Sequence, residues 1–171
     1  RMEPDEELEG LLGMFSPNPK VSMVKRVEEA KRKLRFPEEE EEVAVKLYYK
    51  CIKDMLVLEQ KRLSHDKFVS NLNESINQDE LHCPFLAICF EVVRSTFHKQ
   101  DFLYPYIPRA LNVSHYDFFI MADNFCKMFE GRLNRESIAQ IKKICQQIID
   151  EPIWSSSSSS SSPLLAHLED A

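Results

Sequence analysis

The sequence predicts an all-α fold, arranged as one compact domain around a central apolar helix. Only three glycines occur among the 171 residues, so the tight turns that join short strands are scarce. The apolar residues recur mainly at three- and four-residue steps, which is the period of one helix face. Hydrophobic residues make up 43% of the chain, which is enough for one well-filled core at this length.

The first part of the chain is predicted to hold two helices. A short amphipathic helix is expected over residues 5–15, and the segment SPNPK ends it. Asn18 is the expected N-cap of the next helix, with Pro19 at its first position. This second helix is predicted to run to about Leu34. Its inward-facing residues are predicted to be Val24, Val27 and Ala30.

A long amphipathic helix is predicted over residues 38–61. Pro37 separates it from the preceding helix, and the glutamates that follow lie in its first turn, where the helix dipole favours negative charge. Apolar residues at helical spacing form one face, whereas the lysines and Asp54 lie elsewhere. The predicted core face consists of Leu47, Tyr48, Cys51, Met55 and Leu58.

The most apolar segment, CPFLAICFEVVRSTF at residues 83–97, is predicted to be the central helix. It is hydrophobic nearly all round, so other elements should cover every side of it. Pro84 suits its first turn. Before it, Ser64 is expected to cap a short helix that carries Phe68 and Leu72, and a polar loop follows.

Two further helices are predicted after an irregular, proline-containing connection at residues 101–113, which holds at most one short helix. Ser114 begins a helix that ends at Gly131. Asn134 caps another, which Pro152 stops. The predicted core residues of the two helices are Tyr116, Phe119, Ile120, Phe125 and Met128, and then Ile138, Ile141, Cys145 and Ile148.

Eight consecutive serines interrupt the sequence at residues 155–162. Serine cannot bury enough apolar area to offset the entropy lost on ordering, so this tract is predicted to be a disordered spacer. One last short helix is possible over residues 163–171. The expected organisation is therefore a domain at residues 1–154, the spacer, and the terminal helix.

Charge and hydropathy argue against two classes of partner. The net charge is −6, from 22 Lys and Arg against 28 Asp and Glu, which does not favour the nucleic-acid backbone. No apolar run reaches the length of a membrane span, and residues 1–20 do not resemble a secretion signal. We therefore expect neither direct nucleic-acid binding nor a membrane partner.

The five cysteines and five histidines show no pattern typical of catalysis or metal binding. The cysteines are odd in number, widely spaced and set in apolar helix patterns, which indicates reduced, intracellular thiols packed in a core. No histidine is paired with another ligand at a metal-binding spacing, and the glycines form no phosphate loop. We expect no metal, no cofactor and no enzymatic activity.

A resemblance to a known family emerges from several strings taken in order. The segment ELEGLLGMFSPNPKVSMVKRVEEA is followed by VKLYYKCIKDML, the turn QKRLSHDKF, HCPFLAICFEVV, NVSHYDFF and NRESI, and then by the region of Trp154. Together these strings resemble the A half of the pocket of retinoblastoma-type corepressors, over about residues 7–154. After the serines, SPLLAHLED resembles the helix that closes this A half in the family.

The resemblance implies a cyclin-like helical fold and a role in protein binding in the nucleus. In the family, the A half packs against a B half, and activation peptides of cell-cycle transcription factors bind in the groove between them. The family also tethers corepressor and chromatin complexes and represses cell-cycle genes. The Leu-x-Cys-x-Glu cleft lies in the B half, so this cleft is expected to be absent if the chain is complete, and either a separate chain or a missing portion supplies the B half.

The resemblance carries the transcription-factor groove over only in part. Glu59, Arg62, Asp123 and Lys127 match family positions and keep the charge type. Other positions of the groove depart from the charged or histidine residues of the family, and one carboxylate is replaced by a lysine, which reverses the local field. The sequence leaves open whether such a peptide still binds. The departures are Ile120, Ala139, Lys142, Cys145 and Gln146.

Two Ser-Pro pairs, at Ser16 and Ser162, match the minimal pattern of proline-directed phosphorylation, through which cyclin-dependent kinases regulate the family. A phosphate at Ser162 would lie at the start of the last helix, where negative charge is favourable.

Two other functions stay open at this point. One is a cyclin-like regulatory subunit that docks on a kinase. The other is a small helical hydrolase or metal protein, for which the sequence shows no positive pattern.

Overall fold

The structure is a computed structural model that describes residues 3–98 and 104–150. These residues form α-helices, one short 3₁₀ helix, and a single isolated bridge between Glu130 and Leu133. The all-α prediction is therefore confirmed. The predicted spacer at residues 155–162 and the terminal helix at residues 163–171 lie outside the described residues.

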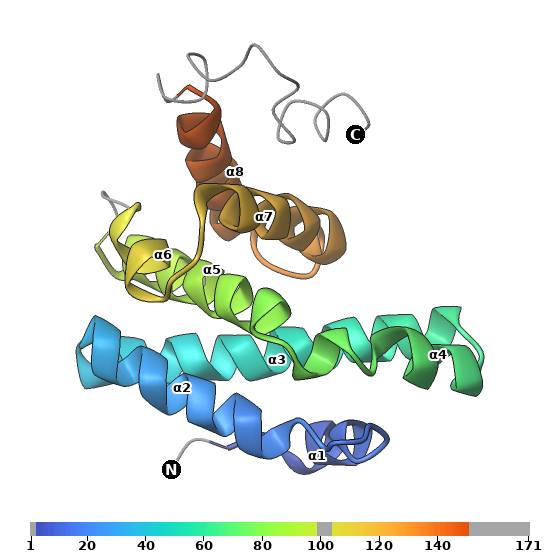
Figure 1. Cartoon of the computed structure of the whole chain (residues 1–171). Helices are drawn as coiled ribbons and strands as arrows, with labels where there is room; N and C mark the ends of the chain where they lie inside the picture. The colour runs from blue at the N-terminus through green and yellow to red at the C-terminus, as the bar shows by residue number, and fades with distance from the viewer. Residues whose placement is uncertain (1–2, 99–103, 151–171) are drawn as a thin grey trace.

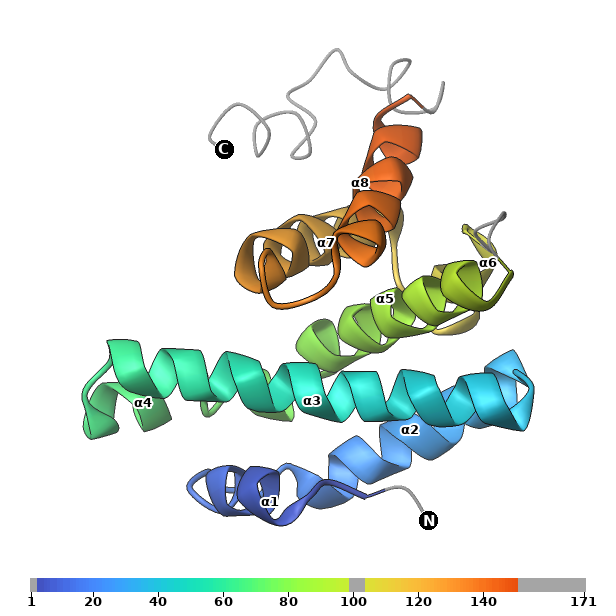
Figure 2. The ribbon, with the colours of Figure 1, turned by 180° about the vertical axis from the view of Figure 1, so that it is seen from behind.

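The helices are arranged in layers around α5 (Figures 1 and 2). On one side of α5 lie the first four helices, and on the other side lie the last two. The helix bounds are α1 Glu6–Leu12, α2 Lys20–Leu34, α3 Glu38–Arg62, α4 His65–Leu72, α5 Asp79–His98, α6 Tyr106–Ala110, α7 His115–Phe129 and α8 Arg135–Ile149, with the 3₁₀ helix η1 at Ser75–Asn77.

Local sequence signals set most of the helix ends. Ser64, Ser114 and Asn134 each accept a hydrogen bond from the backbone N–H three residues later, as predicted for N-caps. Asn18 lies one position outside its predicted role, because Pro19 is the N-cap of α2 and the Asn18 Oδ1 accepts from the N–H of Lys20 at 2.9 Å. The first helix ends at Leu12, before the predicted residue 15, with Gly13 as its C-cap.

The central position of α5 is confirmed, because buried residues occur on all sides of this helix. It begins at Asp79, four residues before the predicted start, so Pro84 lies inside the helix and not in its first turn. Aromatic rings from other helices pack around Phe85, which lies 5.5 Å from the ring of Phe125 and 6.2 Å from that of Tyr48. Helix α5 thus joins both layers into one core.

The predicted core faces of α3 and α7 were partly wrong. Leu47 and Leu58 of α3 are only half-buried, whereas Ile52 and Leu56 are fully buried. The buried arc of α3 is wider than one stripe because α1 packs on one part of it and α5 on another. In α7, Tyr116 is 37% exposed, and Ile120 and Met128 are half-buried. The buried residues of α7 are Phe118, Phe119, Ala122, Phe125, Cys126 and Phe129.

Helix α8 follows the prediction more closely. Ile138, Ile141 and Ile148 are buried as expected, and Ile144 joins them, whereas Cys145 is half-buried. Polar groups also tie α8 to the core, since the Ser95 hydroxyl of α5 donates to Gln140 Oε1 at 2.8 Å. Helices α7 and α8 are therefore fixed to α5 and to each other, which holds the surface they share in place.

Candidate protein-interaction surface

Glu59 and Arg62 lie at the carboxyl end of α3, next to α4. The Arg62 guanidinium donates two hydrogen bonds to Glu59 Oε2, one from Nη2 at 2.6 Å and one from Nε at 3.2 Å. The Arg62 side chain is mostly exposed, and its positive charge lies at the carboxyl end of α3, where the helix dipole favours a cation. An exposed pair of this kind contributes little to stability, so its guanidinium is available to a partner at low cost.

Asp123 and Lys127 lie one turn apart on α7, with their charged groups 3.1 Å apart. Ile120 lies three residues before Asp123, on the same helix face. A second ion pair, between Lys142 of α8 and Glu130, closes at 3.8 Å just beyond the end of α7. The exposed surface along these two helices is therefore a band of charge interrupted by apolar side chains.

Two thiols, those of Cys126 and Cys145, lie close enough to these charges to feel them. Burial raises the pKa of Cys126 to about 11, partly opposed by Lys142. Burial also raises the pKa of Cys145 to about 12, and Cys126 and Asp123 act in the same direction. These mutual influences place α7 and α8 residues within electrostatic reach of one another. Both thiols stay protonated at neutral pH, which argues against a cysteine nucleophile here.

We call this surface the α7–α8 seam and define it by Ile120, Asp123, Lys127, Lys142 and Cys145. The structure thus brings two of the four predicted site residues together with three of the positions that depart from the family. Ala139 and Gln146 are exposed on α8. Glu59 and Arg62 belong to a different element, and α3 and α7 run towards the same side of the molecule in Figures 1 and 2.

Ser16 lies in the turn between α1 and α2, with an exposed side chain. Its backbone is held from both sides by Asn73, whose Oδ1 accepts from the Ser16 N–H and whose Nδ2 donates to the Ser16 carbonyl, both at 2.9 Å. Asn77 Nδ2 donates to the carbonyl of Pro17 at 3.0 Å. Phosphorylation of Ser16 stays a prediction, and Ser162 lies outside the described residues.

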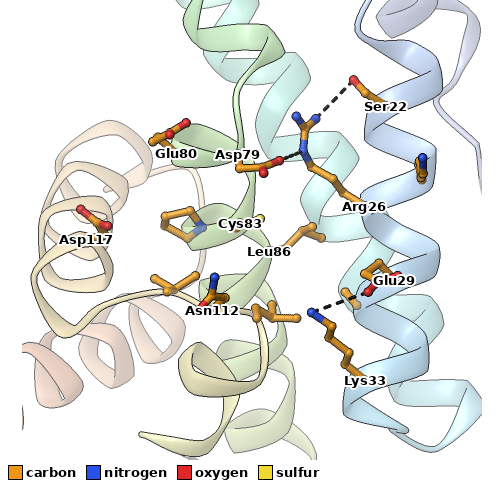
Figure 3. Close-up of a pocket in the computed structure, with 15 residues that line it drawn as sticks. Ser22, Arg26, Glu29, Lys33, Asp79, Glu80, Cys83, Leu86, Asn112 and Asp117 are labelled. Atoms are coloured by element: carbon orange, nitrogen blue, oxygen red, sulfur yellow. Dashed lines mark hydrogen bonds and ion pairs between the residues drawn. The ribbon is translucent and has the colours of Figure 1, made fainter.

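One feature that sequence reasoning missed is a groove between α2, α5 and the start of α7 (Figure 3). Arg26 of α2 reaches across one end of it to the Asp79 carboxylate at 2.7 Å, and also donates to the carbonyl of Asn77. The signal was present in the sequence, because Ser22, Arg26, Glu29 and Lys33 recur at three- and four-residue steps along one helix face. That these four residues line one groove could not be predicted from the sequence, because the opposite side of the groove comes from α5 and the start of α7.

The described part of the chain contains neither a metal-binding cluster nor a helix that could cross a membrane. No cluster of three or more His, Cys, Asp or Glu side chains there could hold a metal ion. Among the same residues, no helix combines the length and apolar character that crossing a bilayer requires.

Comparison with known proteins adds independent information. Residues 1–162 match the family model of the retinoblastoma-associated protein A domain. The chain is 32% identical over 144 residues to retinoblastoma-like protein 2 of Rattus norvegicus, and 30% identical over 169 residues to that of Homo sapiens. It is also 30% identical over 109 residues to retinoblastoma-like protein 1 of Homo sapiens.

These alignments cover most of this chain but little of the relatives. They span 84%, 90% and 64% of this chain, and 12%, 14% and 10% of the respective relatives. The domain match, together with the helical structure around α5, confirms the cyclin-like fold that the resemblance implied. The chain belongs to the retinoblastoma family as its A domain, a non-enzymatic protein-binding module.

Proposed function

We propose that this A domain packs against a retinoblastoma-type B half and forms one wall of a groove for activation peptides of cell-cycle transcription factors. Family membership supports the class of partner. The observation that carries the proposal in the structure is the α7–α8 seam, because it combines exposed ion pairs with half-buried apolar side chains. Such a mixed surface suits a peptide that is held by a few apolar anchors and aligned by charge.

The second wall of this groove is proposed to include the carboxyl end of α3. Arg62 is exposed there, whereas the side chain of its partner Glu59 is only 29% exposed. Glu59 is therefore held against the protein, and the Arg62 guanidinium stays accessible to a partner. An arginine in this setting presents a planar, permanently charged group that can hold a peptide carboxylate through two hydrogen bonds.

Family membership supports the role proposed for the cell. The module would act in the nucleus, where corepressor and chromatin complexes assemble on factors that themselves contact DNA, and it would contribute to repression of cell-cycle genes. Neither nucleic acid nor membrane is needed for this role.

The proposal is tested by mixing the chain with a purified retinoblastoma-type B half and measuring co-elution. One stable complex is expected, and the complex should bind an activation peptide of a cell-cycle transcription factor. A chain that stays monomeric with every B half tried would overturn the proposed packing.

The peptide groove has its own test in a charge-swapped variant, Asp123→Lys with Lys127→Asp. This variant keeps an ion pair on α7 but reverses its polarity, so the fold and the B-half complex should persist. Peptide affinity should fall about tenfold, because charges that aligned the peptide now repel it. Unchanged peptide affinity would show that the seam is not the groove wall.

A further inference from the structure

The groove between α2, α5 and α7 belongs to neither the α7–α8 seam nor the end of α3. Its volume is about 590 Å³, which is within the range of concave sites that bind small ligands. We propose that it binds a segment of another protein in which an apolar side chain stands beside a lysine or arginine. This is a second interaction surface of the module.

The groove combines an apolar floor with charged walls. The floor is formed mainly by α5 and the α6–α7 connection, with Cys83 half-exposed within it. The α2 wall carries Lys25 and Lys33, and the opposite wall carries Glu80 at the start of α5 and Asp117 in the first turn of α7. The apolar floor residues are Ala30, Pro84, Leu86, Leu111 and Val113.

The strongest clue to the occupant is the state of these charges. Lys25 is the lysine of α2 that forms no ion pair with any described residue, whereas Lys20, Lys31 and Lys33 all do. Within the described ranges, Glu80 and Asp117 likewise have no ion-pair partner. Charges of opposite sign thus line the same groove without an ion pair between them, which leaves each of them available to a molecule lying in the groove.

The walls are held at a fixed separation. The Arg26 side chain is only 14% exposed and bridges α2 to Asp79 at 2.7 Å. Its Nη1 also donates to Ser22 at 3.3 Å, which restrains the guanidinium within α2. Figure 3 shows this bridge at one end of the groove and Lys33 and Asn112 at the other. A preformed groove loses little entropy on binding, which favours affinity for a short segment.

Charge complementarity selects the occupant. Glu80 and Asp117 together offer two unpaired carboxylates, so a basic side chain is expected on that wall, and a carboxylate is expected on the wall of Lys25. An apolar side chain between them would cover the floor. Val21, which is 77% exposed one turn before Lys25, can extend the apolar contact past the end of the groove.

The experiment is a selection of randomised short peptides displayed on phage, with the full chain as bait. Enriched peptides are expected to place an aliphatic or aromatic residue within a few positions of Lys or Arg. Their affinity should fall about tenfold when the facing wall is reversed by Glu80→Lys with Asp117→Lys, since two favourable charge contacts become repulsive. Peptides with the basic residue changed to glutamate should regain affinity for that variant.

The matched control is Asp66→Lys with Glu136→Lys. These two exposed carboxylates also lie in first turns, of α4 and α8, so the control imposes the same change on helix dipoles and net charge away from the groove. Peptide affinity should not change in this control.

Cys83 gives a readout of location. Bound peptide should slow the alkylation of Cys83 by N-ethylmaleimide, measured by mass spectrometry. Cys145 of the α7–α8 seam should react at the same rate with and without peptide. The inference is overturned if no enriched peptide is sensitive to reversal of Glu80 and Asp117, or if sensitive peptides leave the alkylation of Cys83 unchanged.

Discussion

Lowering the pH should destabilise this domain through His82, which is fully buried where α5 packs on α3. The Ile76 carbonyl can only accept, so His82 Nε2 donates to it at 2.7 Å, and Nδ1 accepts from the Tyr48 hydroxyl at 2.6 Å. Both bonds are satisfied by the neutral ring. Burial lowers the pKa of His82 to about 4, although the hydrogen bond to Ile76 opposes this shift.

The sign and size of the effect follow from linkage. His82 takes up a proton near pH 6.5 in the unfolded chain but only near about pH 4 in the folded chain. Its neutral form therefore contributes its full stabilisation above pH 6.5, and this contribution is lost as the pH falls below 6.5. From about pH 7 to about pH 5 the loss is about 2 kcal/mol, with a slope approaching about 1.4 kcal/mol per pH unit. The lowered pKa values of Asp5 and Glu29 act below this window.

Urea unfolding followed by circular dichroism measures this slope. The variant His82→Gln should lose most of the pH dependence, even though its stability is lower throughout, and His65→Gln should keep it, because His65 is exposed on α4. A direct NMR titration of the folded wild type should show His82 neutral down to about pH 5. Two results would show that His82 is not the source of the pH dependence: a wild-type slope in His82→Gln, or protonation of the His82 ring near pH 6.5 while the domain is folded.

Other predictions concern neighbouring buried groups. Tyr48→Phe should lower the free energy of unfolding by about 1–3 kcal/mol, because it leaves His82 Nδ1 unpaired. Tyr49→Phe should be neutral or slightly stabilising, because the buried Tyr49 hydroxyl has no hydrogen-bond partner among the described residues. Urea unfolding distinguishes the two variants. Glu40→Ala should cost about 1–3 kcal/mol by thermal unfolding, because it removes the buried carboxylate that His98 contacts at 3.1 Å. Phe85→Ala should cost about 3–5 kcal/mol by the same measurement, since it opens a cavity between both layers; a loss below about 1 kcal/mol would contradict the central role of α5.

The helix ends could be predicted well because their signals are local. A side chain such as Ser64, Ser114 or Asn134 satisfies a backbone N–H three residues away, so the interaction needs nothing distant in sequence. The central position of residues 83–97 was equally accessible, since a helix that is apolar on all sides has no stable place on a surface.

The buried faces of helices were less predictable. Tyr116 fits a helical pattern as well as Phe118 does, and the choice between them depends on the direction in which α5 and α8 approach α7. The same limit applies to Leu58, because the width of a buried arc is set by the number of packed neighbours and not by periodicity.

The fold class, the order of the helices and the family could be predicted from the sequence alone, because periodicity, caps and family strings are properties of consecutive residues. Which charges share a surface became visible only in the folded structure. This structure placed Asp123 and Lys127 on one surface with Lys142 and Cys145, and it placed Lys25, Glu80 and Asp117 around one groove. The physical reason is that packing fixes how helices distant in sequence face each other, and electrostatic interaction depends on that separation in space.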